Sequence, residues 1–177
     1  MPLRIIDVAG LKKTGKTTVV ENLVTELTSR GYQVGTLKKI HIPNFTIDQK
    51  GKDTYRHKKA GAKFVISLAP DEIAIIKEHS GDRKLSEIID LIPQDIEFLI
   101  CEELNENRED ILYILTLDSL DTLDETLKIR SVGKKIIAIA GVVSNNYNHY
   151  ETYPIINTTK KEGVKKLVDI ILQKVKT

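Results

Sequence analysis

Cysteine and aromatic residues are scarce in this chain, and tryptophan is absent. The 177 residues include one cysteine, Cys101, and aromatic residues make up 5% of the total. A lone cysteine excludes a disulfide within the chain and any CxxC metal site, and its place in an apolar run leads us to expect a buried, unreactive thiol. The net charge is only +2, and no patch alternates basic with aromatic residues. These features predict that the chain has no nucleic-acid partner.

Long apolar stretches are also missing. No apolar run approaches the roughly 18 residues of a membrane-spanning helix, and the first residues lack the pattern of a signal peptide. We therefore expect a cytoplasmic protein that makes no membrane contact. A length of 177 residues with 41% hydrophobic residues predicts a single domain over residues 1–177 with its own core.

The most specific motif runs from Gly10 to Thr17, where GLKKTGKT satisfies the pattern G-x-x-x-x-G-K-[ST]. An apolar run at 3–9 precedes it and a helical stripe follows it, which is the strand–loop–helix setting of a phosphate-binding P-loop. In such a loop, backbone N–H groups and the helix N-terminus face the phosphates. Lys16 would contact the β- and γ-phosphates, and the Thr17 hydroxyl would be a ligand of Mg²⁺.

Strand and helix patterns alternate along the rest of the chain. Apolar or β-branched runs predict strands at 3–9, 33–37, 64–68, 72–77, 96–101, 111–117, 136–143 and 153–156, of which the third and fourth form a hairpin. Helical patterns predict a helix with the stripe Val20, Leu23, Val24 and Leu27, ended by Gly31, and further helices from an Asp53 N-cap to Ala60, at 85–92, within 120–129 and over 164–175. This order predicts an α/β fold, a three-layer αβα P-loop NTPase with a mainly parallel sheet.

Two glutamates follow the strand predicted at 96–101. A P-loop needs an acidic residue at the end of a neighbouring buried strand, because Mg²⁺ and its waters must be held opposite the loop hydroxyl. Glu102 directly follows this strand and is the candidate. Glu103 would face the opposite way if the strand continued, so we rank it second. An ordinary solvated pair of charges at a strand end is the alternative.

A second polar segment, residues 48–62, is dense in groups that bind metals or phosphates. Asp48 and Asp53 are candidate ligands of Mg²⁺, directly or through water. Lys52 and Arg56 are candidate phosphate contacts. The alternative is that these residues are helix caps and surface charges, which loops and helix starts favour.

Together these motifs resemble the MobB family of molybdopterin-guanine dinucleotide biosynthesis proteins. The resemblance is carried by the P-loop, Lys38-Lys39-x-His41, Asp48, Gly51-Lys52-Asp53-Thr54-Tyr55-Arg56 and Ala60-Gly61-Ala62. It covers the first third of the chain closely, and the order of strands and helices fits the family over most of the remainder. Three features depart from the family: Glu103 stands where a glycine is common, Lys39 replaces a common histidine, and the P-loop is less rich in serine.

The resemblance implies a GTP-binding protein, usually a homodimer with weak Mg²⁺-dependent GTPase activity, that assists the guanylyltransferase attaching GMP to molybdopterin. It implies catalytic roles for Lys16 and Glu102, and metal ligation by Thr17, Asp48 and Glu102. Gly51, Lys52 and Asp53 match the family's second motif. The implied nucleotide-binding residues are Gly10, Leu11, Lys12, Lys13, Thr14, Gly15, Lys16, Thr17 and Thr18.

The sequence does not identify the base, because the guanine-reading signature Asn-Lys-x-Asp of many GTPases is missing, and two other functions remain open. Thr159-Lys160-Lys161-Glu162 is a degenerate version of it, and the alternative role of this segment is the start of the final helix. One other function is a small-molecule kinase, which needs a lid with clustered arginines; the arginines after the P-loop are scattered, at Arg30, Arg56, Arg83, Arg108 and Arg130. Another is a non-hydrolysing interaction module gated by a nucleotide.

Overall fold

The computed structural model describes residues 3–78, 81, 84–130, 135–151 and 153–175. The chain divides into two compact units, one made of Met1–Lys39 with Ile92–Thr177 and the other of Ile40–Leu91. The second unit is therefore one continuous stretch of chain inserted into the first. The single domain expected over residues 1–177 stays a prediction.

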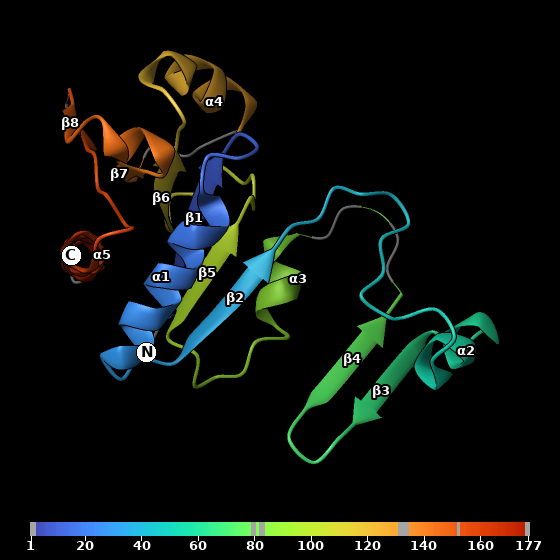
Figure 1. Cartoon of the computed structure of the whole chain (residues 1–177). Coiled ribbons are helices and arrows are strands. Elements are labelled where there is room, and N and C mark those ends of the chain that lie inside the picture. The colour runs from blue at the N-terminus through green and yellow to red at the C-terminus, as the bar shows by residue number, and fades with distance from the viewer. Residues whose placement is uncertain (1–2, 79–80, 82–83, 131–134, 152, 176–177) are drawn as a thin grey trace. The chain divides into compact units, whose positions relative to one another are not determined.

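A five-stranded parallel sheet forms the centre of the first unit (Figure 1). Its strands, in the spatial order β2-β5-β1-β6-β7, are β2 (Val34–Lys38), β5 (Phe98–Glu102), β1 (Arg4–Gly10), β6 (Ile111–Thr116) and β7 (Ile136–Ala140). The register pairs Val8 with Glu102 on one side of β1 and Gly10 with Thr116 on the other. The P-loop that follows β1 therefore begins between the ends of β5 and β6.

Two helices cover one face of this sheet, α1 (Lys16–Ser29) and α5 (Lys161–Lys174). In Figure 1, α1 lies along β1 and β5. The buried side chains between helices and sheet include Ile6, Val8, Val19, Leu23, Leu27, Phe98, Ile100, Ile114, Leu167, Val168 and Ile171. The stripe on α1 is rotated from the expected one, because Val19 is buried whereas Val20 and Val24 are only partly buried. Gly31 ends this helix with φ +89°, as expected.

The opposite face of the sheet packs against α4 (Leu123–Ile129) and the short 3₁₀ turns Leu120–Thr122 and Val142–Asn145. Ala9, Leu115 and Ile139 come from this face because side chains alternate along each strand. Helices thus flank a mainly parallel sheet, which confirms the predicted α/β class.

The second unit contains a helix, a hairpin and a further short helix. They are α2 (Asp53–Lys59), β3 (Phe64–Leu68), β4 (Ile73–Lys77) and α3 (Leu85–Ile89). The predicted hairpin is confirmed, since β3 and β4 pair antiparallel. On one of its faces the cross-strand pairs Ile66–Ile75 and Leu68–Ile73 are exposed, beside an exposed Phe64.

Several element ends differ from the expected ones. The strand expected at 136–143 ends at Ala140, because Gly141 has φ +87° and begins a 3₁₀ turn. Asp53 is the first residue of α2 instead of its N-cap, since Lys52 keeps the extended backbone of that position. The helix expected at 85–92 ends at Ile89.

The strand expected at 153–156 is also shorter. It comprises only β9 (Tyr153–Pro154), which pairs with β8 (His149–Tyr150). Ile155 instead bridges to Ile139 of the main sheet. The degenerate guanine signature at 159–162 lies at the start of α5, where Thr159 N–H donates to Asn157 Oδ1 and Lys160 is the N-cap residue. The helix-start role of this segment is therefore confirmed.

Candidate functional site

The P-loop has a tight backbone, in which some residues adopt the left-handed conformation and others leave no room for a side chain. Gly15 has φ +93° and Lys13 has φ +65°. A Cβ atom on Gly10 would lie 2.2 Å from Thr116 Oγ1, so β1 and β6 approach too closely there for any side chain. These features explain why glycines stand at both ends of the motif. Thr17 and Thr18 follow on the exposed first turn of α1.

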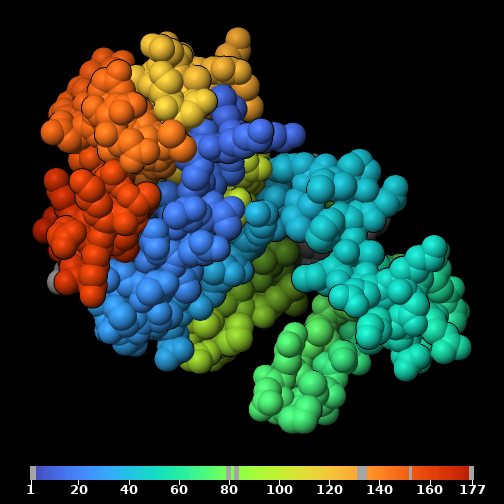
Figure 2. All heavy atoms as spheres, in the orientation of Figure 1, coloured from blue at the N-terminus to red at the C-terminus, as the bar shows by residue number. Residues whose placement is uncertain are grey.

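The loop is braced by two segments that the sequence analysis did not identify. The buried Thr14 hydroxyl shares a hydrogen bond of 2.7 Å with Thr116 Oγ1, and its carbonyl accepts from the Val142 N–H over 3.2 Å. A Cβ on Gly141 would lie 2.2 Å from the Thr14 carbonyl oxygen. In Figure 2 the blue atoms of the first loop lie against yellow and orange atoms of the segments that follow β6 and β7. Thr14 therefore has a bracing side chain, while Lys12 and Lys13 are exposed.

Lys16 is buried although it carries a charge. Its Nζ donates to the backbone carbonyls of Gly10 and Leu11 and lies 2.9 Å from Glu103 Oε1. The ammonium group is thus folded over the loop, where a phosphate bound to the loop N–H groups would meet it.

Glu102 joins three elements at one end of the sheet. Its Oε1 accepts from the Thr17 hydroxyl over 3.1 Å and from Lys38 Nζ over 3.1 Å. Lys38 ends β2, and the register pairs it with Glu102 of β5. The structure therefore brings the predicted residue pair Thr17 and Glu102 together. A hydroxyl and a carboxylate are oxygen donors of the kind that Mg²⁺ prefers, so this pair fits the ion.

Glu103 does not face away from the loop as expected. The strand ends at Glu102, and Glu103 has φ +61°, so its side chain turns toward Lys16. Its Oε1 also lies 3.3 Å from Arg130 Nη2. Arg130, at the C-terminal end of α4, thus belongs to the P-loop region, although the sequence analysis counted it among scattered arginines. No sequence signal placed it there, because the contact joins distant segments. Arg83, counted with it, lies outside the described residues.

A buried carboxylate, Asp7, lies on the sheet face opposite α1. One oxygen accepts from the Leu104 N–H over 3.1 Å, and burial raises the pKa of Asp7 to about 6. The thiol of Cys101, its cross-strand partner, is buried, and burial raises its pKa as well. The expected buried cysteine is therefore confirmed. Asp7 was missed, although a single acid inside an apolar run was a visible signal.

An open hollow borders the Thr17–Glu102 pair. It measures about 470 Å³ and is lined by Thr17, Val20, Glu21, Val24, Thr25, Thr36, Leu37, Lys38 and Glu102. Its walls come from α1, β2 and β5, so it extends from the predicted metal site along the exposed side of α1.

The second-motif residues all belong to the other unit. The Asp48 carboxylate accepts from the Thr54 hydroxyl over 2.8 Å, and Gly51 has φ +94° ahead of α2. Lys52 is the N-cap residue of α2, and the exposed Asp53 pairs with Arg56 over 3.4 Å. Within their own unit these residues shape the start of a helix. Metal ligation by Asp48 stays a prediction.

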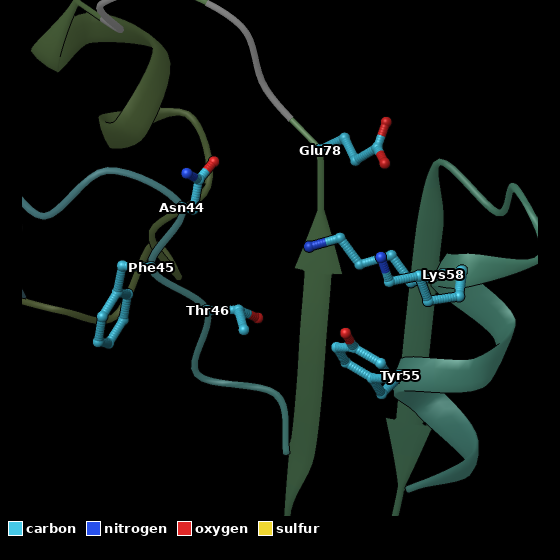
Figure 3. A pocket seen from close by; sticks show the side chains of 7 residues that line it. Asn44, Phe45, Thr46, Tyr55, Lys58 and Glu78 are labelled. Atoms are coloured by element: carbon cyan, nitrogen blue, oxygen red, sulfur yellow. The ribbon is translucent and has the colours of Figure 1, made fainter. Parts of the chain in front are cut away.

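The second unit has a hollow of its own, of about 480 Å³. Figure 3 shows Tyr55 and Lys58 of α2 and Glu78 at the end of β4, with Asn44, Phe45 and Thr46 on a loop across from them. Its lining mixes positive and negative side chains, and it combines residues of α2 with loop residues that precede the second motif.

Among the described residues, no three His, Cys, Asp or Glu side chains gather as a ready-made metal centre. None of the helices in the described ranges has the length and apolar character needed to cross a membrane.

Comparison with known proteins identifies the family. The family model described as molybdopterin guanine dinucleotide synthesis protein B, MobB, matches residues 5–142. The crystal structure of Bacillus subtilis MobB superposes with a TM-score of 0.74 at 20% identity, covering 94% of this chain and 97% of that one. At that identity the likeness shows the fold.

Two sequence relatives are named for the biosynthesis of the same dinucleotide. The chain is 36% identical over 74 residues to the molybdopterin-guanine dinucleotide biosynthesis adapter protein of Haemophilus influenzae, covering 42% of this chain and 41% of that protein. It is 28% identical over 106 residues to the Escherichia coli protein of the same name, covering 60% and 54%. The chain spans about half the length of these curated relatives. Because the family model matches most of the chain, this chain belongs to the MobB family.

Proposed function

We propose that this chain is a GTP-binding adapter protein of molybdopterin-guanine dinucleotide biosynthesis that uses Mg²⁺ and hydrolyses GTP slowly. The observation that carries the proposal is the Thr17–Glu102 hydrogen bond beside Lys16, at a P-loop within a MobB-family chain. An adapter in cofactor assembly would act in the cytoplasm.

The P-loop would hold the phosphate chain. Backbone N–H groups between Gly10 and Thr18 would donate to phosphate oxygens, and the start of α1 would add its partial positive charge. Lys16 would contact the β- and γ-phosphates and offset the charge that develops between them during hydrolysis. The remaining loop residues, Leu11, Lys12, Lys13 and Thr14, would act through their backbone.

Thr17 and Glu102 would hold Mg²⁺, Thr17 as a direct ligand and Glu102 directly or through water. The ion would neutralise the phosphate oxygens. The hydrogen bond between the two residues supports this role, because it holds their oxygen atoms close enough together to bind one ion. Asp48 is proposed as a third ligand on the family resemblance alone.

The hydrogen bonds of Glu102 support slow hydrolysis. A fast GTPase needs a group that orients the attacking water. The Oε1 atom of Glu102 accepts hydrogen bonds from Thr17 and Lys38, which suits holding a metal more than positioning a water. GTP would therefore serve mainly as a bound signal, which suits an adapter.

The partner proposed on the relatives' names and the family resemblance is the guanylyltransferase of the same pathway. We also propose a homodimer, in which the apolar face of the β3–β4 hairpin meets a second copy. Two-stranded sheets are marginal alone, and the exposed pairs Ile66–Ile75 and Leu68–Ile73 give an uncovered surface that dimerisation would bury.

The test is calorimetric titration with GTP and with ATP, each with and without Mg²⁺. Tighter binding of GTP than of ATP, strengthened by Mg²⁺, is expected. A preference for ATP together with release of ADP on adding a metabolite would contradict the adapter proposal and favour a kinase.

A further inference from the structure

The carboxylate of Glu103 is bound by two cations at the mouth of the P-loop. Its Oε1 lies 2.9 Å from Lys16 Nζ and 3.3 Å from Arg130 Nη2. All three side chains are largely buried, with exposed fractions of 18% for Glu103, 8% for Lys16 and 14% for Arg130. One negative group therefore faces two positive ones in a place that is shielded from water.

The backbone holds Glu103 in this position. Its φ is +61°, in the left-handed region that costs a non-glycine residue about 1 kcal/mol or more. Its N–H donates to the Val8 carbonyl over 3.2 Å, which fixes the turn to β1. The chain thus keeps a charged side chain at a position where backbone geometry favours glycine, and the carboxylate it carries points to the loop lysine.

Arg130 has spare hydrogen-bonding capacity at this point. Its Nε is buried and has no hydrogen-bond partner among the residues that the structure describes. A guanidinium group carries five N–H donors in a planar fork that matches the oxygens of a phosphate. Among the described residues, the contact with one oxygen of Glu103 leaves much of that capacity unused.

A carboxylate and a phosphate present the same chemistry to Lys16, which is a negative charge on oxygen. We propose that Lys16 and Arg130 form a two-cation site for a polyphosphate, and that Glu103 fills this site until a polyphosphate displaces it. The inference rests on the proposed function only in taking the P-loop as a phosphate site. It adds Arg130 as a second phosphate contact and Glu103 as an internal competitor.

Displacement has a thermodynamic consequence. A polyphosphate binds Lys16 and Arg130 only after their contacts with Glu103 are broken, so its apparent affinity falls by the stability of those contacts. The displaced carboxylate also remains next to a polyanion and repels it. Both effects mean that Glu103 lowers the affinity of the site for a polyphosphate.

The experiment measures binding of inorganic tripolyphosphate and of GTP to the full chain by calorimetry, with and without Mg²⁺. Tripolyphosphate is the first probe because it has no base. The variants are Glu103→Gln, Glu103→Gly, and Arg130→Gln placed in both the native and the Glu103→Gln backgrounds. Glu109→Gln and Arg30→Gln are charge-matched controls, since Glu109 is exposed and Arg30 lies at the far end of α1.

Glu103→Gln is expected to bind tripolyphosphate about tenfold more tightly than the native chain, which corresponds to about 1.4 kcal/mol. In the Glu103→Gln background, Arg130→Gln is expected to weaken binding about tenfold. If Arg130→Gln lowers the melting temperature, Arg130→Lys replaces it, and a smaller loss of affinity is expected because the charge is kept.

Unchanged or weaker binding by Glu103→Gln would overturn the competitor role. No effect of Arg130→Gln in the Glu103→Gln background would show that Arg130 only anchors Glu103, and would overturn the two-cation site. Tight GTP binding that is equal in native and Glu103→Gln chains would leave the proposed function standing without this inference. Conversely, the variants could show the expected order of tripolyphosphate affinities while GTP binds no more tightly than tripolyphosphate. That result would support the inference and contradict GTP as the ligand.

Discussion

The Thr17 hydroxyl donates a hydrogen bond of 3.1 Å to Oε1 of Glu102, across 85 positions of the sequence. This bond links the first turn of α1 to the end of β5. It places a P-loop hydroxyl and an acidic strand end at one point, as Mg²⁺-dependent nucleotide binding requires.

Glu102→Gln should weaken the effect of Mg²⁺ on GTP binding about tenfold, because the amide removes the negative charge that would hold the ion or its waters. Calorimetry with and without Mg²⁺ measures this effect. Glu97→Gln is the matched control, since Glu97 pairs with Arg4 at the opposite end of β5. An unchanged Mg²⁺ effect would show that Glu102 does not hold the ion.

Lys16→Ala should lower GTP affinity by about tenfold or more, because a charge-assisted hydrogen bond to phosphate is lost. If the nucleotide controls the adapter, stimulation of the guanylyltransferase by GTP should be lost too. Lys165→Ala, on the exposed side of α5, is the control. Stimulation that survives Lys16→Ala would mean that the nucleotide site is not the switch.

Gly10→Ala should destabilise the fold by about 1–3 kcal/mol, since the new Cβ would overlap Thr116 Oγ1 and its carbonyl oxygen. Gly35→Ala is a matched strand control: its Cβ would meet the Ile96 side chain at 3.3 Å, which is able to shift. Urea unfolding compares the two. Equal stability of Gly10→Ala and the native chain would contradict the close approach of β1 and β6.

Asp7 should make the protein less stable as pH rises. Its folded-state pKa of about 6 lies above the ordinary value of 3.8, mainly through burial and partly through the nearby Glu103 and Glu106. The folded state therefore binds the proton more tightly than the unfolded chain does. Its contribution to the free energy of unfolding should fall by about 2 kcal/mol between pH 4 and pH 7.

Asp7→Asn removes this contribution, so the pH dependence of the native chain minus that of the variant isolates it. The subtraction matters because Asp110 and Asp118 have lowered pKa values and act in the opposite direction. Urea unfolding at several pH values is the measurement, with the exposed Glu109→Gln as control. Parallel curves for the native chain and Asp7→Asn would contradict the raised pKa.

Ile66→Lys should convert the proposed homodimer to a monomer, because it places a charge in the centre of the apolar hairpin face. Ser67→Lys puts the same side chain on the other face of β3 and should leave the dimer intact. Light scattering at micromolar concentration gives the mass of each variant. A native chain that is monomeric under these conditions would contradict the homodimer.

The α/β class and the P-loop were predictable because their signals are local. The motif occupies eight neighbouring residues, and buried parallel strands appear as continuous apolar runs. The position of Glu102 beside Thr17 was also predictable, since strand ends meet at one edge of a parallel sheet. Glu103 and Arg130 were not, because a left-handed turn redirected one side chain and a contact between distant segments placed the other.

The contacts that brace the P-loop were also not predictable from the sequence. Thr14 belongs to the motif, but its bond to Thr116 and its carbonyl contact with Val142 depend on how β6 and β7 end. Periodicity predicted the stripe of α1 only in part. Leu23 and Leu27 are buried as expected, but Val19 is buried more fully than its neighbour Val20, because the packed sheet decides between them.

The unit Ile40–Leu91 interrupts the chain between β2 and β5, two strands that pair directly in the sheet. Joining them therefore closes a long loop, and the entropy of closing a loop grows only with the logarithm of its length, by about 0.6 kcal/mol for each doubling. The sheet that carries the P-loop is accordingly insensitive to how much chain is inserted there. The length of this stretch can therefore change while β2 and β5 stay paired and the P-loop stays folded.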